Sequence, residues 1–144
     1  MAKTSIENLV RDEIAGLTLL TNYLNGLQPP RDPATVLYPR ADEDPGAATP
    51  TPFIVARYGP RVGRITLLGT FELFVYDDPA QRYWRIEDII SYLNHHFDYL
   101  RFGVTTGGGP QFFRAFHQLD SARSVDDGWG KNYMSARYEV TSSL

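Results

Sequence analysis

Cysteine is absent from this chain of 144 residues, which excludes disulfides and thiolate metal sites. No apolar run approaches the roughly 20 residues that a membrane-spanning helix needs. The first residues, MAKTSIENLVRDE, carry charges throughout and lack the apolar core of a signal peptide. We therefore expect a protein that folds in the reducing cytoplasm and has no membrane partner.

Lysine is scarce as well, because Lys3 and Lys131 are the only lysines among the basic residues. The formal net charge of -3 argues against a protein that grips nucleic acid by its phosphates. Arginine makes bidentate and stacking contacts and is enriched at protein interfaces. The preference for arginine is explained either by such an interface or by codon bias in a GC-rich genome.

The composition is that of an ordinary globular protein, with 42% hydrophobic and 22% charged residues. The length suits one domain, so we predict a single domain over residues 1–144. Two segments rich in glycine, proline and small polar residues, 41–52 and 101–110, are predicted to be mobile loops.

The stretch Arg64–Leu100 organises the predicted fold. Up to Tyr76 its apolar residues alternate as in a strand, and after the turn Asp77-Asp78-Pro79 their spacing becomes helical. One strand face carries Ile65, Leu67, Phe71, Leu73 and Val75, and the apolar face of the helix carries Ile86, Ile89, Ile90, Leu93, Phe97 and Leu100. A strand followed closely by an amphipathic helix predicts a sheet covered by that helix.

Hydrophobic patterns place further elements on both sides of this stretch. An amphipathic helix is predicted from an N-cap at Thr4 to Leu24, and Gly16 weakens its middle, where a kink or a break is expected. Strands are predicted at 36–38, 53–58, 111–119 and 132–140, and the second of these forms a hairpin with the long strand. The predicted fold is therefore α+β, in the order α-β-β-β-α-β-β. It has a mainly antiparallel sheet of four to five strands with two amphipathic helices on one face.

Residues that could support catalysis do not form a recognisable site. His95 and His96 point about 100° apart on a helix, and His117 is expected to be a half-buried strand residue. The triple glycine at Gly107–Gly109 lacks the lysine and hydroxyl residue of a phosphate-binding loop. We predict no enzyme activity, no cofactor and no metal site.

The second face of the predicted sheet is unusually aromatic. It carries Leu68, Phe74 and Tyr76 on the long strand, and Phe112 and Phe116 on a later strand. An exposed apolar surface of this kind marks association, so these residues are the candidate subunit interface. The alternative is that segments of the same chain, 41–52 or the residues around Trp129, fold over this face.

The order of elements resembles that of the tail terminator proteins, also called tail completion proteins, and related minor tail proteins of long-tailed bacteriophages. The resemblance rests on the helix IENLVRDEIAGLTLL, the short strand VLYPR, the strands FIVARY and ITLLGTFELFVYDD, the helix IEDIISYLNHHFDYL and the closing strand YMSARYEVT. It covers nearly the whole chain and contains no invariant motif.

The resemblance implies a structural virion protein that forms a ring, usually hexameric. Such a ring ends the tail tube and joins it to the head-side connector, at the junction between tail and neck of a particle assembled in the host cytoplasm. The implied partners are other copies of the chain, the tail tube protein, the connector or neck protein, and DNA that passes through the bore without specific binding. An acidic protein suits such a bore because it repels phosphates.

Two alternatives stay open at this point: a head-closure or other neck protein, and a small α+β module that binds a ligand or peptide. The clustering of acidic residues in the 41–52 loop leads us to expect that this loop faces the bore or a neighbouring ring. The triple-glycine loop is a second candidate for such contacts. These candidate residues are Asp42, Glu43, Asp44, Gly107, Gly108 and Gly109.

Overall fold

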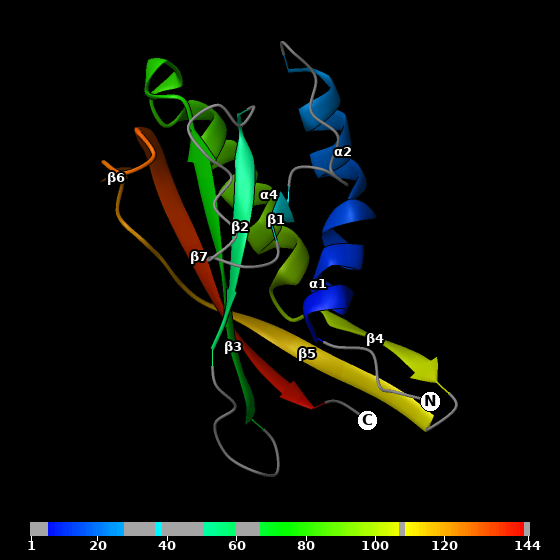
Figure 1. The fold of residues 1–144 in the computed structure, drawn as a ribbon. Helices are drawn as coiled ribbons and strands as arrows, with labels where there is room; N and C mark the ends of the chain where they lie inside the picture. The colour runs from blue at the N-terminus through cyan, green and yellow to red at the C-terminus, as the bar shows by residue number, and fades with distance from the viewer. Residues whose placement is uncertain (1–5, 28–36, 39–50, 60–66, 107–108, 143–144) are drawn as a thin grey trace.

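The computed structural model describes residues 6–27, 37–38, 51–59, 67–106 and 109–142 (Figure 1). Its helices are α1 (Ile6–Ala15), α2 (Thr18–Asn25) and α4 (Trp84–Phe97), with a short 3-10 helix, η1 (Pro79–Gln81), before α4. In the described part of the chain, no helix is both long enough and apolar enough to cross a membrane.

The predicted N-terminal helix is two helices, α1 and α2, because the chain leaves the helical conformation at Leu17. This residue has φ -77° and ψ 99°, which is extended backbone, and it follows directly after Gly16. Gly16 weakens helical structure, so the predicted break is confirmed. Both helices bury one apolar stripe, which contains Leu9, Val10, Ile14, Leu17, Leu20 and Leu24. Thr4, the predicted N-cap, lies outside the described residues.

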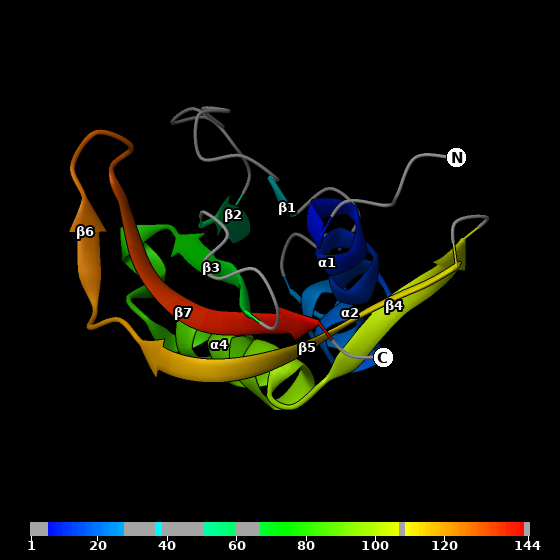
Figure 2. The same cartoon turned by 90° about the horizontal axis from the view of Figure 1, so that it is seen from below.

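Within the described residues, seven strands form one sheet in the order β1-β2-β3-β7-β5-β4, and β6 lies off this path and pairs with β7. The sheet is antiparallel except where β1 runs parallel to β2. Figures 1 and 2 show that it is strongly curled, with the β4–β5 hairpin extending to one side. The strands are β1 (Leu37–Tyr38), β2 (Phe53–Tyr58), β3 (Leu67–Asp77), β4 (Arg101–Thr106), β5 (Gly109–Asp120), β6 (Ser124–Asp126) and β7 (Lys131–Ser142).

The predicted count of two helices and four to five strands is therefore too low. The segment 101–110 is not the predicted mobile loop, because 101–106 form β4 and the next described residues open β5. Strand β4 forms because its backbone pairs with β5 and its Phe102 side chain is buried in the core. Strand β6 was missed because it has only three residues and one apolar side chain.

Helices α1, α2 and α4 pack against one face of the sheet, which we call the inner face. Their apolar residues share a single core with the inward side chains of β2, β3, β5 and β7. The inward strand residues include Ile54, Ala56, Phe71, Leu73, Val75, Phe113, Ala115, Ala136, Tyr138 and Val140. The predicted class is confirmed at this level: an α+β fold whose mainly antiparallel sheet has its helices on one face.

A β-bulge in β5 changes which side chains face the helices. The register shifts between His117 and Leu119, so that Leu119 pairs with the exposed Arg137 while Asp120 pairs with the buried Ala136. Directly paired residues share a face of the sheet. Strict alternation along the predicted strand 111–119 places Leu119 on the same side as Phe113, and the bulge makes that expectation wrong. Leu119 lies on the outer face and is 51% exposed.

Candidate interaction surface

The outer face of the sheet, opposite the helices, is the candidate functional surface. Every second cross-strand pair of β2 with β3, of β3 with β7 and of β7 with β5 places both of its side chains on this face. The aromatic residues of this face fall into two groups. One group lies over β2, β3 and the start of β7, and the other lies on the β4–β5 hairpin.

The first group is an aromatic cluster formed by Phe53, Phe74, Tyr76, Trp129 and Tyr133. The Phe53 and Tyr76 rings stack at a centroid distance of 5.1 Å, and Tyr76 stacks on Tyr133 at 5.2 Å. Trp129 lies against Tyr76 at 4.9 Å and against Phe53 at 5.9 Å. Tyr76 is consequently only 8% exposed. The segment around Trp129 therefore covers this part of the outer face, as the alternative interpretation of the sequence proposed.

The turn between β6 and β7 holds Trp129 in this position. The backbone N–H of Trp129 donates to Oδ1 of Asp126 over 2.9 Å, and the N–H of Gly130 donates to the Asp126 carbonyl over 2.8 Å. Gly130 has φ +64°, a left-handed conformation that glycine adopts without strain. Burial, followed by the charge of Asp126, raises the pKa of Tyr76 to about 12.

The aromatic cluster has a polar border. The Arg57 guanidinium lies over the Phe74 ring, 5.1 Å from its centroid. On the neighbouring strands, Ser135 donates its hydroxyl to Glu72 over 2.6 Å. An aromatic centre with an arginine and a paired carboxylate at its edge has the composition of a protein interface.

The second group is the arginine face of the hairpin, which we define as Tyr99, Arg101, Phe112, Arg114 and Phe116. Arg101 and Arg114 are direct cross-strand partners. The Arg101 guanidinium lies 4.0 Å from the centroid of the Phe112 ring, and Nη1 of Arg114 donates to the carbonyl of Tyr99 over 2.9 Å. The Tyr99 ring, 66% exposed, meets Phe116 edge-on at 5.4 Å.

The local sequence explains this arrangement. Phe112 pairs across the hairpin with Gly103, which has no side chain, so Arg101 can extend diagonally over the Phe112 ring. Tyr99 has φ 64°, an uncommon conformation for a residue with a side chain, and it follows Asp98, the C-cap of α4.

The predicted interface residues divide between the two groups. Phe74 and Tyr76 belong to the aromatic cluster, and Phe112 and Phe116 belong to the arginine face. Leu68 lies in β3, but its side chain is outside the described residues, as are Asp42, Glu43, Asp44, Gly107 and Gly108. Gly109 opens β5, where it pairs with Thr106.

Sequence reasoning missed Arg101, Arg114 and Tyr99. A signal was present, because residues 101–116 contain two arginines and no carboxylate in a chain of net charge -3. Because this segment contains glycines and a proline, the sequence pattern predicted a loop there and not the strand pairing that brings the two arginines together.

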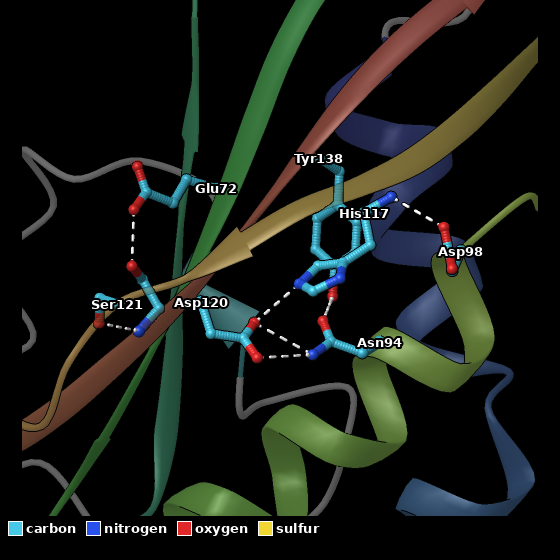
Figure 3. Close-up of polar contacts among 8 residues, drawn as sticks. Glu72, Asn94, Asp98, His117, Asp120, Ser121 and Tyr138 are labelled. Carbon is cyan, nitrogen blue, oxygen red and sulfur yellow. Dashed lines mark hydrogen bonds and ion pairs between the residues drawn. The ribbon is translucent and has the colours of Figure 1, made fainter.

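A polar network joins the end of α4 to the β-bulge on the inner side of the sheet (Figure 3). Asn94 donates its amide to both Asp120 oxygens at 3.0 and 3.1 Å, and it accepts the hydroxyl of Tyr138 at 2.6 Å. His117 Nε2 lies 2.9 Å from Asp120, and its backbone N–H donates to Asp98 over 3.0 Å. His117 is half-buried, as predicted.

These groups bond to one another, and the network fixes α4 against β5 and β7. Burial and the charges of Asp120 and Asp98 raise the pKa of Tyr138, so its hydroxyl stays protonated and donates to Asn94. Among the described residues, no group of three or more histidine and acidic side chains could hold a metal ion.

A scan of the sequence against protein-family models gives no match, and a search of curated proteins gives none either.

Proposed function

We propose that this protein is a structural subunit that assembles into a closed ring of identical copies. The ring ends the tail tube of a long-tailed bacteriophage and joins it to the head-side connector. The protein functions through surface contacts with copies of itself, with the tail tube protein and with the connector, while DNA passes through the bore.

One observation carries the assembly part of this proposal. Helices α1, α2 and α4 cover the inner face, whereas the outer face carries the arginine face, in which two arginines and three aromatic side chains meet. Arginine and aromatic residues are enriched at protein interfaces, and arginine, tyrosine and tryptophan are enriched among the few residues that carry most of the binding energy. A ring also needs two different surfaces on each subunit, because one patch must meet another around the circle.

The place in the virion rests on the resemblance in element order to tail terminator proteins. What supports it is that an N-terminal helical segment, a hairpin of β2 and β3, the helix α4 and a strand region ending in β7 follow one another along the chain. A net charge of -3 is compatible with a bore that lets DNA pass without retaining it.

Sedimentation velocity of the purified full chain tests assembly, combined with electron microscopy of the same sample. A single closed species of fixed mass and ring-shaped particles are expected. A second assay polymerises the tail tube protein of the same phage with and without this protein. Tubes should stop growing when it is added, and rings should appear at one tube end. A chain that stays monomeric at all concentrations and leaves tube growth unchanged would contradict the proposal.

A further inference from the structure

The arginine face contains an electrostatic conflict within the chain itself. Arg101 and Arg114 are direct cross-strand partners, and like charges in that position destabilise a strand pair. The residues from 101 to 116 include no carboxylate, and Glu139, which pairs with Phe116 on the neighbouring strand, accepts a hydrogen bond from Gln118. An anionic partner placed over the two guanidinium groups would remove this repulsion.

The opposite end of the molecule is acidic. Figures 1 and 2 both place the β4–β5 hairpin at one end, and β6 with the start of α4 at the other. At this second end Asp78 and Asp127 are exposed and Asp126 is half-exposed. We define these three residues, together with Trp84 and Val125, as the acidic end.

Four basic residues lie among five carboxylates at this end, which are Asp77, Asp78, Glu87, Asp126 and Asp127. Arg85 is bonded to the buried Asp77, and Arg123 is paired with Glu87. Lys131, opposite Asp126 in the β6–β7 register, is only 9% exposed. Arg82 is the remaining exposed arginine of η1 and its flanks. Outside the two ion pairs, three carboxylates therefore stand against the exposed Arg82 and the nearly buried Lys131, which leaves a small excess of negative charge on this surface.

Apolar side chains accompany the charge. Trp84 is 72% exposed and Val125 is 58% exposed. The two elements that carry them are tied together, because the Tyr83 hydroxyl donates to the Ser124 carbonyl over 2.9 Å. An exposed tryptophan on a fixed support is the kind of residue that anchors an interface.

We infer that the arginine face of one copy docks on the acidic end of a second copy. This inference rests on the proposed ring and names its contact. The two surfaces are opposite in charge, both carry aromatic side chains, and they lie at opposite ends of one chain. A contact between them is heterologous, so repetition of it builds a closed ring when the rotation between copies closes.

Charge reversal of the full chain tests this contact. Arg101→Glu and Asp127→Lys each place like charges in every contact of the ring, so each variant should assemble at least tenfold more weakly than the wild type in sedimentation velocity. Arg11→Glu is the matched control, because Arg11 is exposed on α1, on the helical side. Its assembly should stay within twofold of the wild type. Circular dichroism establishes that each variant is folded.

Mixing the two variants gives the sharpest result. In an equimolar mixture, the glutamate introduced at position 101 of one variant meets the lysine introduced at position 127 of the other. The native Arg101 of the second variant meets the native Asp127 of the first. Every contact in an alternating ring is then attractive, so assembly should return only in the mixture. Recovery in the mixture also shows that neither variant lost assembly through misfolding.

Other outcomes overturn the inference. If Arg101→Glu lowers binding to a DNA duplex while assembly is unchanged, the arginine face is a nucleic-acid surface. If wild-type rings form and neither reversal weakens them, the docking contact is wrong and the proposed ring stands. If the wild type never assembles, both the docking contact and the proposed ring are wrong.

Discussion

Arg85 at the start of α4 donates two hydrogen bonds to the carboxylate of Asp77 at the end of β3. Nε lies 2.7 Å from Oδ2 and Nη2 lies 2.5 Å from Oδ1, and the Asp77 side chain is fully buried. This pair fixes the angle between strand β3 and helix α4, which covers the inner side of that strand. The hydrogen bonds and the charge of Asp77 raise the pKa of Arg85 despite its partial burial.

Breaking this pair should destabilise the protein strongly. Arg85→Met leaves the buried Asp77 carboxylate, which still accepts from the Asp78 backbone N–H, without its positively charged partner, so we expect a loss of about 3 kcal/mol in the free energy of unfolding. Urea denaturation measures the loss. The control is Asp78→Asn, an exposed neighbour whose side chain caps η1 by accepting from Ala80, a contact that asparagine can also make. A loss of less than about 1 kcal/mol in Arg85→Met would contradict this account of the pair.

The two tryptophans should differ sharply in their contribution to stability. Trp129 covers Tyr76 and Phe53, so Trp129→Ala should cost about 2 kcal/mol, less than a full core truncation because Trp129 is half-buried. Trp84 is 72% exposed, so Trp84→Ala should stay within about 0.5 kcal/mol of the wild type. Urea denaturation followed by circular dichroism compares them, and equal losses would refute the proposed cover.

Each of these variants retains one tryptophan, and the fluorescence of that tryptophan reports how exposed it is to solvent. The emission of Trp129, measured in Trp84→Ala, should lie at shorter wavelength and be quenched less by acrylamide than the emission of Trp84 measured in Trp129→Ala.

Alkaline pH should weaken the fold through Tyr76. Burial raises the folded-state pKa of Tyr76 to about 12, above the ordinary value of 10.0. The raised pKa of Tyr76 therefore contributes to the free energy of unfolding. This contribution is fully present below about pH 10 and is lost as the pH rises from about 10 to about 12, because the unfolded chain releases the Tyr76 proton first. At about pH 11 the loss is about 1.4 kcal/mol.

Tyr76→Phe isolates this effect. The difference in unfolding free energy between wild type and variant should shift in favour of the variant between about pH 9 and about pH 11. Other buried tyrosines titrate in both proteins and cancel in the comparison. A difference that stays constant with pH would show that the Tyr76 proton is not linked to folding.

The hydroxyl of Tyr138 should depend on Asn94. Tyr138 is fully buried and donates to Asn94, so Asn94→Ala leaves the hydroxyl without that acceptor and should cost about 2 kcal/mol. Adding Tyr138→Phe should restore part of the loss, since the unsatisfied group is then absent. His95→Ala, an exposed neighbour on α4, is the control. Strictly additive losses in the double variant would contradict a direct coupling.

Much of the core followed from periodicity. The inward residues of β3 and the apolar stripe of α4 lie where alternation and helical spacing predict them, because both patterns reflect burial on one side. Gly16 indicated the break between α1 and α2 because the low helical propensity of glycine is a local property that the sequence shows directly.

The remaining features depend on partners distant in sequence. Strand β4 begins at Arg101 in a glycine-rich segment and is held by its pairing with β5, which no local propensity reveals. The bulge after His117 reverses the facing of Leu119, and a period-two pattern cannot show an inserted residue. Trp129 was one of two possible covers for Tyr76, and only packing could decide between them.

The sequence therefore predicted the aromatic residues of the candidate surface but not its arginines. Phe112 and Phe116 were expected on the second face, whereas Arg101 and Arg114 become neighbours only once the hairpin has formed.

A cryo-electron microscopy map of the assembled particle tests the central claim most directly. We predict a closed ring of this chain at the end of the tail tube, with the outer face of each sheet, including Arg101 and Arg114, in the contacts between copies. A map in which the chain is absent from the tail–neck junction, or in which copies meet only through their helices, would contradict it.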